Sequence, residues 1–254
     1  MNNIRTRRTI RKYKTDAVSE DLLNQLLSDA SRTQTMGNLQ LYSVVVTRDV
    51  EMKHRLSPAH FNQPMVEDAP VVLTICADFR RTTLWCKNRQ ADPGYDNFLS
   101  FINAASDALL YTQTFCNLAE EAGLGCCYLG TTVYMPQMII DILKLPELVV
   151  PIATITVGWP DECPPLTDRL GIEAFIHNET YQDYTPERID KFYKEKEALP
   201  ENKEFVRING KETLAQVFTD CRYTRRDNIA MSKGLIEVLR KQGFLSPEKR
   251  GISE

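Results

Sequence analysis

Apolar and polar residues alternate from residue 19 to residue 160 in a pattern that predicts strands separated by helices. Three runs rich in β-branched residues, at 42–47, 71–77 and 151–157, are short and nearly continuously apolar, which is typical of buried strands. A shorter strand is expected at 126–131, with a glycine at its end. We therefore predict an α/β or α+β fold built on one sheet.

Helical patterns fill the intervals between these strands. Ser19 precedes an amphipathic stretch whose leucines share one face, and a serine is a favourable N-cap. Residues 98–122 form the longest predicted helix, which is apolar on nearly every side and is therefore expected to be buried. Further helices are expected at 135–143, from Thr185 onward, and at 229–242, where Leu235, Ile236 and Leu239 would be buried.

Small side chains recur along the predicted 98–122 helix at steps of three and four residues, and so share one face. They are Ala105, Ala108, Thr112, Cys116 and Ala119. Because small side chains let a second helix approach closely, the stripe predicts packing across a dimer interface. Burial in the core of a single chain explains the same spacing, so both interpretations stay open.

Polar stretches connect the predicted elements. Residues 56–65 and 80–97 are expected to be irregular, and the second is long enough to form a lid or to contact a partner. The last third of the chain is more polar, and 196–211 has a charged, irregular pattern. We predict a single domain over 1–254, in which 180–254 form a polar helical C-terminal extension.

Composition excludes several classes of protein. The 254 residues are 43% hydrophobic and 26% charged, with a net charge of −3, which argues against a dedicated nucleic-acid binder. No window approaches the roughly 18 continuous apolar residues of a membrane span, and no secretory signal is visible. The seven cysteines, without a C-x-x-C pair, suggest buried free thiols in a reducing cytoplasm. No histidine pairs with a cysteine at ligand spacing, so no metal site is expected.

A basic stretch near the N-terminus carries the most suggestive chemistry. Residues 5–13 contain five cations and two threonines around the apolar Ile10. Guanidinium forks and hydroxyls match the oxygens of a doubly charged phosphate. A solvated or nucleic-acid-binding arm has the same composition, so the stretch alone does not decide between these interpretations.

Later segments offer polar groups or bare backbone. The turn at 31–40 contains Gly37, which would let the backbone approach a ligand. An ordinary surface loop has the same composition, so both interpretations of this turn stay open. Gly130 would bring a backbone N–H against the edge of a planar ligand. Arg169 follows a strand end, a usual place for a ligand contact. A second basic cluster, 222–226, precedes the C-terminal helix.

In this order, the pieces resemble the nitroreductase family of flavoproteins, specifically its NADPH-dependent, oxygen-insensitive nitroreductase and flavin reductase branch. The resemblance covers nearly the whole chain and depends on motifs that are weak singly and strong together. They are Arg7-Arg8-Thr9-Ile10-Arg11-Lys12-Tyr13; Gln63 before Cys76-Ala77-Asp78-Phe79; Gly123-Leu124-Gly125 with Tyr128-Leu129-Gly130; Gly158-Trp159-Pro160; Arg169-Leu170; and Arg225-Arg226-Asp227 with the C-terminal helix.

This resemblance implies an α+β fold with a central, mostly antiparallel sheet flanked by helices, in an intertwined homodimer that binds FMN at its interface. It also implies a ping-pong reaction, in which NADPH or NADH reduces FMN and a small acceptor is then reduced. Typical acceptors are nitroaromatics, quinones and flavins. Neither nucleic acid nor a membrane is expected as a partner, and the location expected is cytoplasmic.

The resemblance further implies roles for matching residues. Those that would contact FMN are Arg7, Arg8, Thr9, Arg11, Thr35, Gly37, Gln63, the backbone of Leu129, Gly130 and Thr131, and Arg169. Arg8, Arg11 and Arg169 would hold the phosphate, and the backbone around Gly130 would lie at the N5/O4 edge of the ring. Arg225 would bind the 2′-phosphate of NADPH, with Arg222 as a weaker neighbour. No side chain is assigned a catalytic role, because the cofactor carries the chemistry.

Several positions depart from the family pattern. Histidine is common at Arg7, serine at Thr9 and Gly37, glycine at Thr131, and lysine at Thr167. The last change removes a cation near flavin N1/O2 that would stabilise the anionic reduced ring. Unless Arg7 replaces that cation, we expect a lower flavin potential.

Three other functions remain to be weighed. A specialised flavoenzyme of the same fold, such as a dehalogenase or a flavin-converting enzyme, would differ in residues 80–97. A non-enzymatic nucleic-acid binder would use both basic clusters, but the aromatic–basic interleaving of such proteins is absent. A non-catalytic flavin store would bind FMN without turning over NADPH.

Overall fold

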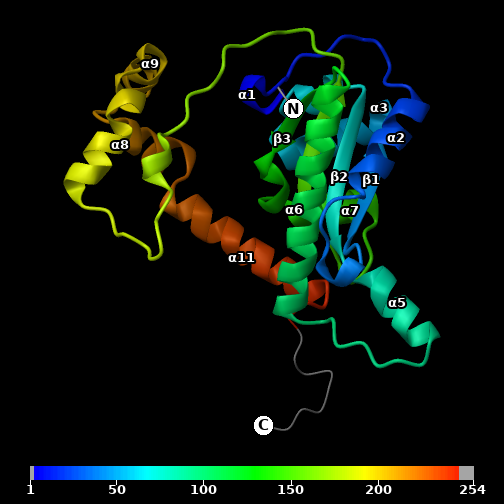
Figure 1. The fold of residues 1–254 in the computed structure, drawn as a ribbon. Helices are drawn as coiled ribbons and strands as arrows, with labels where there is room; N and C mark the ends of the chain where they lie inside the picture. The colour runs from blue at the N-terminus through cyan, green and yellow to red at the C-terminus, as the bar shows by residue number, and fades with distance from the viewer. Residues whose placement is uncertain (1–2, 246–254) are drawn as a thin grey trace. The chain divides into compact units, whose positions relative to one another are not determined.

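The computed structural model of the chain describes residues 3–245 (Figure 1). It contains two compact units. One takes in the chain up to Pro165 together with the residues from Met231, and the other is Leu166–Ala230. The single domain with an extension from residue 180 stays a prediction.

The first unit is built on a four-stranded sheet with the order β1-β2-β4-β3, in which every neighbouring pair is antiparallel. The strands are β1 (Tyr42–Thr47), β2 (Val71–Asp78), β3 (Gly125–Leu129) and β4 (Val149–Gly158). All residues of β2 and β4 are buried, which explains their continuous apolar runs. The predicted α+β fold with an antiparallel sheet is confirmed.

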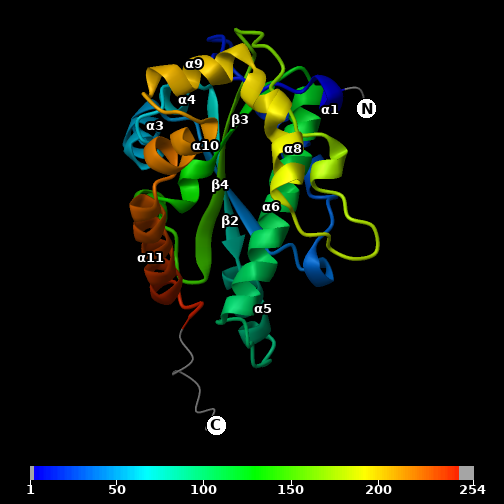
Figure 2. The same ribbon diagram turned by 90° about the vertical axis from the view of Figure 1, so that its left-hand side faces the viewer.

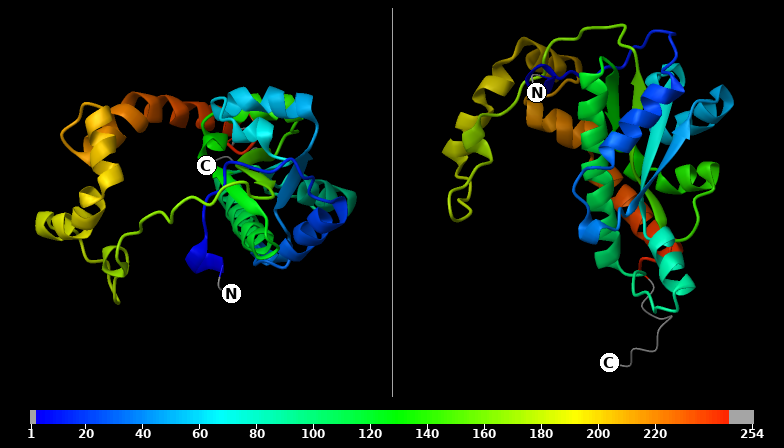
Figure 3. Two further views of the ribbon diagram at one scale, coloured as in Figure 1. Left: turned by 90° about the horizontal axis from the view of Figure 1, so that it is seen from above. Right: turned by 45° about the vertical axis from the view of Figure 1, so that its right-hand side comes forward.

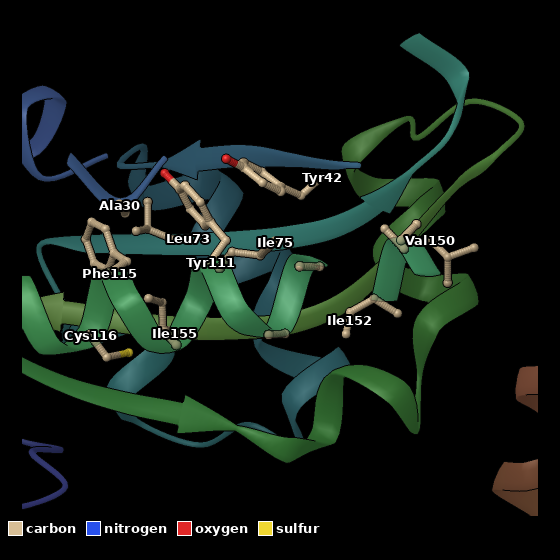
Figure 4. Packing of buried hydrophobic residues seen from close by; sticks show 14 of the residues in the cluster. Ala30, Tyr42, Leu73, Ile75, Tyr111, Phe115, Cys116, Val150, Ile152 and Ile155 are labelled. Carbon is tan, nitrogen blue, oxygen red and sulfur yellow. The ribbon is translucent and has the colours of Figure 1, made fainter. Parts of the chain in front are cut away.

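The helix α6 (Phe98–Glu121) runs along one face of this sheet, as Figures 1 and 2 show. Beside it lies α2 (Glu20–Ala30), as the ribbon in Figure 3 shows. Its predicted N-cap, Ser19, accepts a hydrogen bond from the Leu22 N–H. In the core between helix and sheet, Tyr111 and Phe115 of α6 meet Tyr42 and Leu73 of the strands (Figure 4).

A second hydrophobic cluster lies on the opposite face of the sheet. Cys126 of β3 belongs to the core under α6, whereas Cys127 and Leu129 belong to the second cluster. Successive residues of a strand point to opposite faces, so the two clusters cover the two sides of one sheet. The helices of this second face are short: α3 (Val50–Leu56), η2 (Ser57–His60), α4 (Met65–Asp68) and α7 (Pro136–Leu143). The turn η3 (Gly130–Val133) follows β3 directly.

The small-residue stripe of α6 faces the core of its own chain. Ala108, Thr112, Cys116 and Ala119 are all buried, and three of them belong to the core cluster against the sheet. The prediction that this stripe meets a second subunit is therefore wrong for these residues. Large apolar side chains are exposed elsewhere on the helix: Phe98, Leu99, Ile102, Leu109 and Leu110.

Three segments predicted to be irregular contain helices. Residues 80–97 begin with α5 (Arg80–Asn88), which starts where Asp78 accepts a hydrogen bond from the Arg81 N–H. Residues 56–65 include η2, and residues 196–211 include α9 (Pro200–Ile208), with a proline at its first position. Each of these helices is short, and polar or charged side chains surround its few apolar residues, so the sequence pattern alone does not reveal it.

The unit Leu166–Ala230 contains η4 (Ile172–Ala174), α8 (Pro186–Ala198), α9, α10 (Leu214–Gln216) and η5 (Val217–Arg222). Thr185 caps α8 as predicted, accepting a hydrogen bond from the Arg188 N–H. Of residues 166–230, all of which the structure describes, only Ala174, Leu214 and Val217 are buried. This unit therefore has a very small core.

The last helix, α11 (Arg225–Lys241), begins four residues earlier than predicted and joins the two units. Val238 and Leu239 are buried near its end. Ile236, which was expected to be buried, is exposed, whereas Leu239 is placed as predicted.

Candidate cofactor site

The basic N-terminal stretch is fastened to the edge of the sheet. The Ile10 N–H donates to the Cys126 carbonyl at 3.1 Å, and the Lys14 N–H donates to the Trp159 carbonyl at 2.9 Å. Ile10 is buried directly above Gly125, where a Cβ would come within 2.6 Å of the isoleucine side chain. Only glycine at 125 lets the stretch lie this close to β3.

Two arginines of this stretch make different contacts. Arg8 donates from Nε to the Pro164 carbonyl at 2.7 Å and from a terminal nitrogen to the Thr6 carbonyl at 2.8 Å. Arg11 lies beside the Cys127 thiol, where its charge opposes the rise in that thiol's pKa that burial causes. Within residues 3–245, neither arginine forms an ion pair with a carboxylate. Both positive charges are thus available to an anionic ligand.

Arg7 is paired differently. Its Nε lies 3.6 Å from Oε1 of Glu120, a half-buried carboxyl whose pKa is raised by burial and lowered by the charge of Arg7. A second carboxylate, that of Glu162, binds the backbone of the basic stretch. Its Oε1 accepts hydrogen bonds from the backbone N–H groups of Arg11 and Lys12 at 2.5 and 3.0 Å. Because its charge is already matched by Glu120, Arg7 is poorly suited to replace the lysine that this chain lacks at position 167.

An open cavity of about 320 Å³ adjoins the stretch. Its lining includes Arg7, Arg8, Glu120 and Glu162, so cations and carboxylates meet there. The volume is at the lower end of the range of about 300–1,000 Å³ that is usual for small-molecule sites.

The other end of β3 presents bare backbone. Gly130 is exposed, and a Cβ added there would have nothing within 4 Å. Next to it, the Thr131 hydroxyl lies 2.8 Å from Nδ1 of His60, and Nε2 of Gln63 donates to the His60 carbonyl at 3.0 Å. The predicted site residues Gln63 and Thr131 are therefore brought together by a histidine that the sequence analysis did not select.

Thr35 and Gly37 lie in the turn before β1. The Thr35 hydroxyl donates to Oδ2 of Asp107 at 2.5 Å and accepts from the Gln40 N–H at 2.8 Å. Gly37 has a φ of +57°, in the left-handed region that favours glycine. Since its proton is used by Asp107, Thr35 can contact a ligand only by accepting a hydrogen bond or through its backbone.

The remaining predicted residues lie in the unit Leu166–Ala230. Arg169 donates hydrogen bonds to Oγ1 of Thr167 at 2.8 Å and to the Asp168 carbonyl at 2.7 Å. Thr167, which stands where the family commonly has lysine, thus helps to orient the Arg169 side chain. Arg222 lies over the Phe205 ring at 4.8 Å, and Arg225 is exposed at the start of α11. Their roles in binding FMN or NADPH stay predictions.

Five of the seven cysteines are buried free thiols, and Cys163 and Cys221 are exposed. Across residues 3–245, no three His, Cys, Asp or Glu side chains gather closely enough to hold a metal ion. In the same residues, every helix is too short or too polar to cross a membrane.

Fold and site together define an α+β protein in which Arg8 and Arg11, without an ion-pair partner among residues 3–245, lie beside the edge strand β3, and bare backbone follows that strand. Such an edge suits an elongated ligand with a phosphate and a planar ring. Residues 4–159 match the family model described as "Nitroreductase family", which is more than half of the chain, and the chain belongs to this family.

Individual relatives agree with this membership. The FMN reductase [NAD(P)H] of Bacillus subtilis is 31% identical over 93% of this chain and 94% of its own length. The oxygen-insensitive NADPH nitroreductase of Salmonella typhimurium is 28% identical over 93% and 94%. A crystal structure from Bacteroides fragilis, described as a candidate oxidoreductase, is 63% identical, covers 97% of this chain and 100% of its own, and has a TM-score of 0.96.

Proposed function

We propose that this protein is an FMN-dependent oxidoreductase that takes a hydride from NAD(P)H and reduces a small acceptor by a ping-pong mechanism. Family membership over residues 4–159 and the names of its relatives, an FMN reductase and an NADPH nitroreductase, support this function. The acceptor is a nitroaromatic, a quinone or a flavin. No observation in the structure favours a nucleic-acid binder, a dehalogenase or a flavin-converting enzyme.

One observation of the structure carries the cofactor assignment. Arg8 and Arg11 lie beside β3 without a carboxylate partner within residues 3–245, and at the far end of the same strand Gly130 faces open space. The residues present thus fit a ligand with an anionic phosphate and a flat ring.

In this site FMN supplies two-electron hydride chemistry, which no protein side chain can provide. The chain binds and orients it. Arg8, Thr9 and Arg11 hold the phosphate, since guanidinium and hydroxyl groups satisfy its oxygens. The backbone from Leu129 to Thr131, with Gln63 beside it, supports the ring edge. NAD(P)H and the acceptor bind in turn at the open face, so one exposed site serves both half-reactions.

We also propose that the protein forms a homodimer, because the exposed side of α6 carries large apolar side chains. Five large apolar side chains of this helix are exposed in the single chain, more than the scattered apolar residues usual on a monomer surface. We propose that a second copy of the chain packs against these side chains and buries them. Sedimentation velocity should give a dimer, and Leu109→Glu should shift it toward monomer. A monomeric wild type would remove this part of the proposal.

A cytoplasmic location, with no nucleic-acid or membrane partner, is also proposed. The seven unpaired cysteines support a reducing compartment, and the net charge of −3 disfavours polyanions.

The decisive experiment is an absorbance spectrum of the purified protein before and after NADPH is added without oxygen. Flavin bands that bleach on addition, and return when an acceptor such as a quinone is added, are the expected result. Bands that bleach but never return would indicate a flavin store without turnover. Bands that persist with both NADPH and NADH would contradict the donor, and a colourless protein that takes up no FMN would overturn the function.

The phosphate contact can be tested separately. Arg11→Ala should weaken FMN retention at least tenfold, because a charge-assisted hydrogen bond to a phosphate is worth about 1.5–3 kcal/mol. Arg5→Ala is the matched control, since Arg5 belongs to the same basic stretch but is exposed and outside the proposed site. Equal FMN dissociation constants for Arg11→Ala and wild type would contradict the role of Arg11.

A further inference from the structure

His60 and Thr131 form a contact that neither the family pattern nor the proposed function assigns. His60 ends η2, Thr131 lies in η3, and the two turns pack against each other. The ring nitrogen Nδ1 lies 2.8 Å from the threonine hydroxyl oxygen. His60 is 0% exposed, and its other nitrogen, Nε2, is buried and has no hydrogen-bond partner among residues 3–245. A fully buried imidazole thus makes one side-chain hydrogen bond, and makes it to the residue beside Gly130.

The protonation of this ring follows from its burial. Desolvation lowers the pKa of His60 to about 4, so the imidazole is neutral at physiological pH and carries one N–H. If that proton were on Nε2, a buried N–H donor would lack a partner, which is costly because its bond to water is not replaced. If it is on Nδ1, it donates to Thr131 and only an acceptor lone pair is left without a partner, which proteins tolerate better. The Nδ1–H tautomer is therefore favoured.

That tautomer determines what the threonine hydroxyl can do. Because Oγ1 of Thr131 accepts from His60, its own proton remains to be donated. Among residues 3–245, this hydroxyl has no hydrogen bond besides the one to His60. Thr131 is only half-buried, and its neighbour Gly130 faces open space. The free donor thus lies next to the surface at which a planar ligand would rest.

We propose that His60 is a positioning residue that fixes the Thr131 hydroxyl as a hydrogen-bond donor to the N5/O4 edge of the bound flavin. This inference rests on the proposed function, because it needs FMN beside Gly130. A donor at this edge stabilises the charge that the ring gains on reduction, and it comes from a side chain where relatives commonly have glycine. Here the protein adds a hydroxyl close to the ring, while it lacks a lysine at position 167.

The tautomer can be tested without a cofactor. The chain contains three histidines, so ¹⁵N-histidine labelling gives few ring signals, and His60→Asn identifies those of His60 by their loss. Nδ1 of His60 should have the shift of a protonated nitrogen and Nε2 that of an unprotonated one, with no titration above pH 5. A proton on Nε2, or a titration near pH 6.5, would overturn the inference.

The effect on the flavin is tested through its reduction potential, measured by dye equilibration in the FMN-loaded protein. Thr131→Val should lower the equilibrium constant for reduction by up to about tenfold, the upper end of the usual net contribution of one hydrogen bond. For a two-electron couple this corresponds to about 30 mV. Thr131→Ser should restore the potential. Thr74→Val is the matched control, because Thr74 is buried in β2, lies outside the site, and has a hydroxyl without a hydrogen-bond partner in the described part of the chain.

The role of His60 is tested through the same reduction potential. His60→Leu should lower the potential as Thr131→Val does, and the double variant should fall no further. His60→Asn, whose side-chain N–H replaces Nδ1–H, should keep most of the potential. If His60→Leu does not fold, the Asn variant and the Thr131 series still decide the question.

Failure of the inference and failure of the proposed function give different results. Potentials of Thr131→Val and Thr131→Ser equal to that of wild type would show that the contact merely ties η2 to η3, and would overturn the inference alone. A wild-type protein that binds no FMN would overturn both.

Discussion

Replacing Asp107 should disturb both the stability of the chain and its site. This carboxylate lies in the middle of α6, is 1% exposed, and accepts three hydrogen bonds from the turn before β1. The donors are the Thr35 hydroxyl at 2.5 Å, the Met36 N–H at 2.9 Å and the Leu41 N–H at 3.1 Å. One buried charge thus determines the conformation of the loop that contains Gly37.

The size of the effect follows from these three bonds. A hydrogen bond to a charged group contributes about 1.5–3 kcal/mol. In Asp107→Ala, Thr35 and Met36 are near enough to solvent to bond water instead, whereas the buried Leu41 N–H loses its partner outright. We therefore expect a loss of about 3–4 kcal/mol, a large part of the roughly 5–15 kcal/mol of a typical domain.

Urea unfolding at pH 7, followed by circular dichroism, measures this change as a lower midpoint at unchanged slope. Asp141→Ala is the control, since Asp141 is exposed and accepts one bond from Gln137 at 2.9 Å; it should change stability by no more than about 0.5 kcal/mol. Asp107→Ala should also retain less FMN. A loss below about 1 kcal/mol would refute the view that this carboxylate holds the loop.

Three other results are expected. Between pH 6.5 and pH 4 the unfolded chain binds a proton at His60 that the folded chain, with its lowered pKa, does not. The free energy of unfolding should therefore fall by about 3 kcal/mol as the pH is lowered through this range. In urea unfolding, the midpoint of His60→Asn should not show this decrease, and the same pH dependence in the variant and the wild type would contradict the prediction. Tyr13→Phe removes a hydroxyl that lies 2.7 Å from the Ile10 carbonyl oxygen and 2.7 Å from Oγ1 of Thr156. Calorimetry should show that the free energy of unfolding falls by about 1–2 kcal/mol. An unchanged melting temperature would contradict a stabilising role for these hydrogen bonds. Arg225→Ala should raise KM for NADPH but not for NADH in steady-state kinetics; equal increases would exclude a contact to the 2′-phosphate.

Much of the fold could be predicted where local pattern and burial agree. The strand at 42–47 is placed at its observed bounds, because β-branched residues suit a buried strand. Ser19 and Thr185 are observed as caps, since their hydroxyls satisfy the free N–H groups of a helix start. The short helices α5 and α9 were missed because their few apolar residues stand among charged ones.

The candidate site was predictable only in part. The arginines could be identified from their clustering, but the contacts that orient them come from Glu162 and Pro164, about 150 residues away. His60 was missed because it lies in a stretch that looks polar and solvent-exposed. Asp107 was missed as well, although a carboxylate in the middle of a helix that is apolar on nearly every side was a signal that it is buried and bonded.

The scarcity of buried residues in the unit Leu166–Ala230 has an evolutionary consequence. Substitutions at exposed positions rarely change stability by more than about 0.5 kcal/mol, so most of this segment is free to vary without unfolding the chain. The family match ends at residue 159, just before it begins. A lineage can thus keep the sheet and the arginines beside it while this segment changes in sequence. If Arg222 and Arg225 bind NADPH as predicted, the preference between NADPH and NADH can diverge there with little effect on stability.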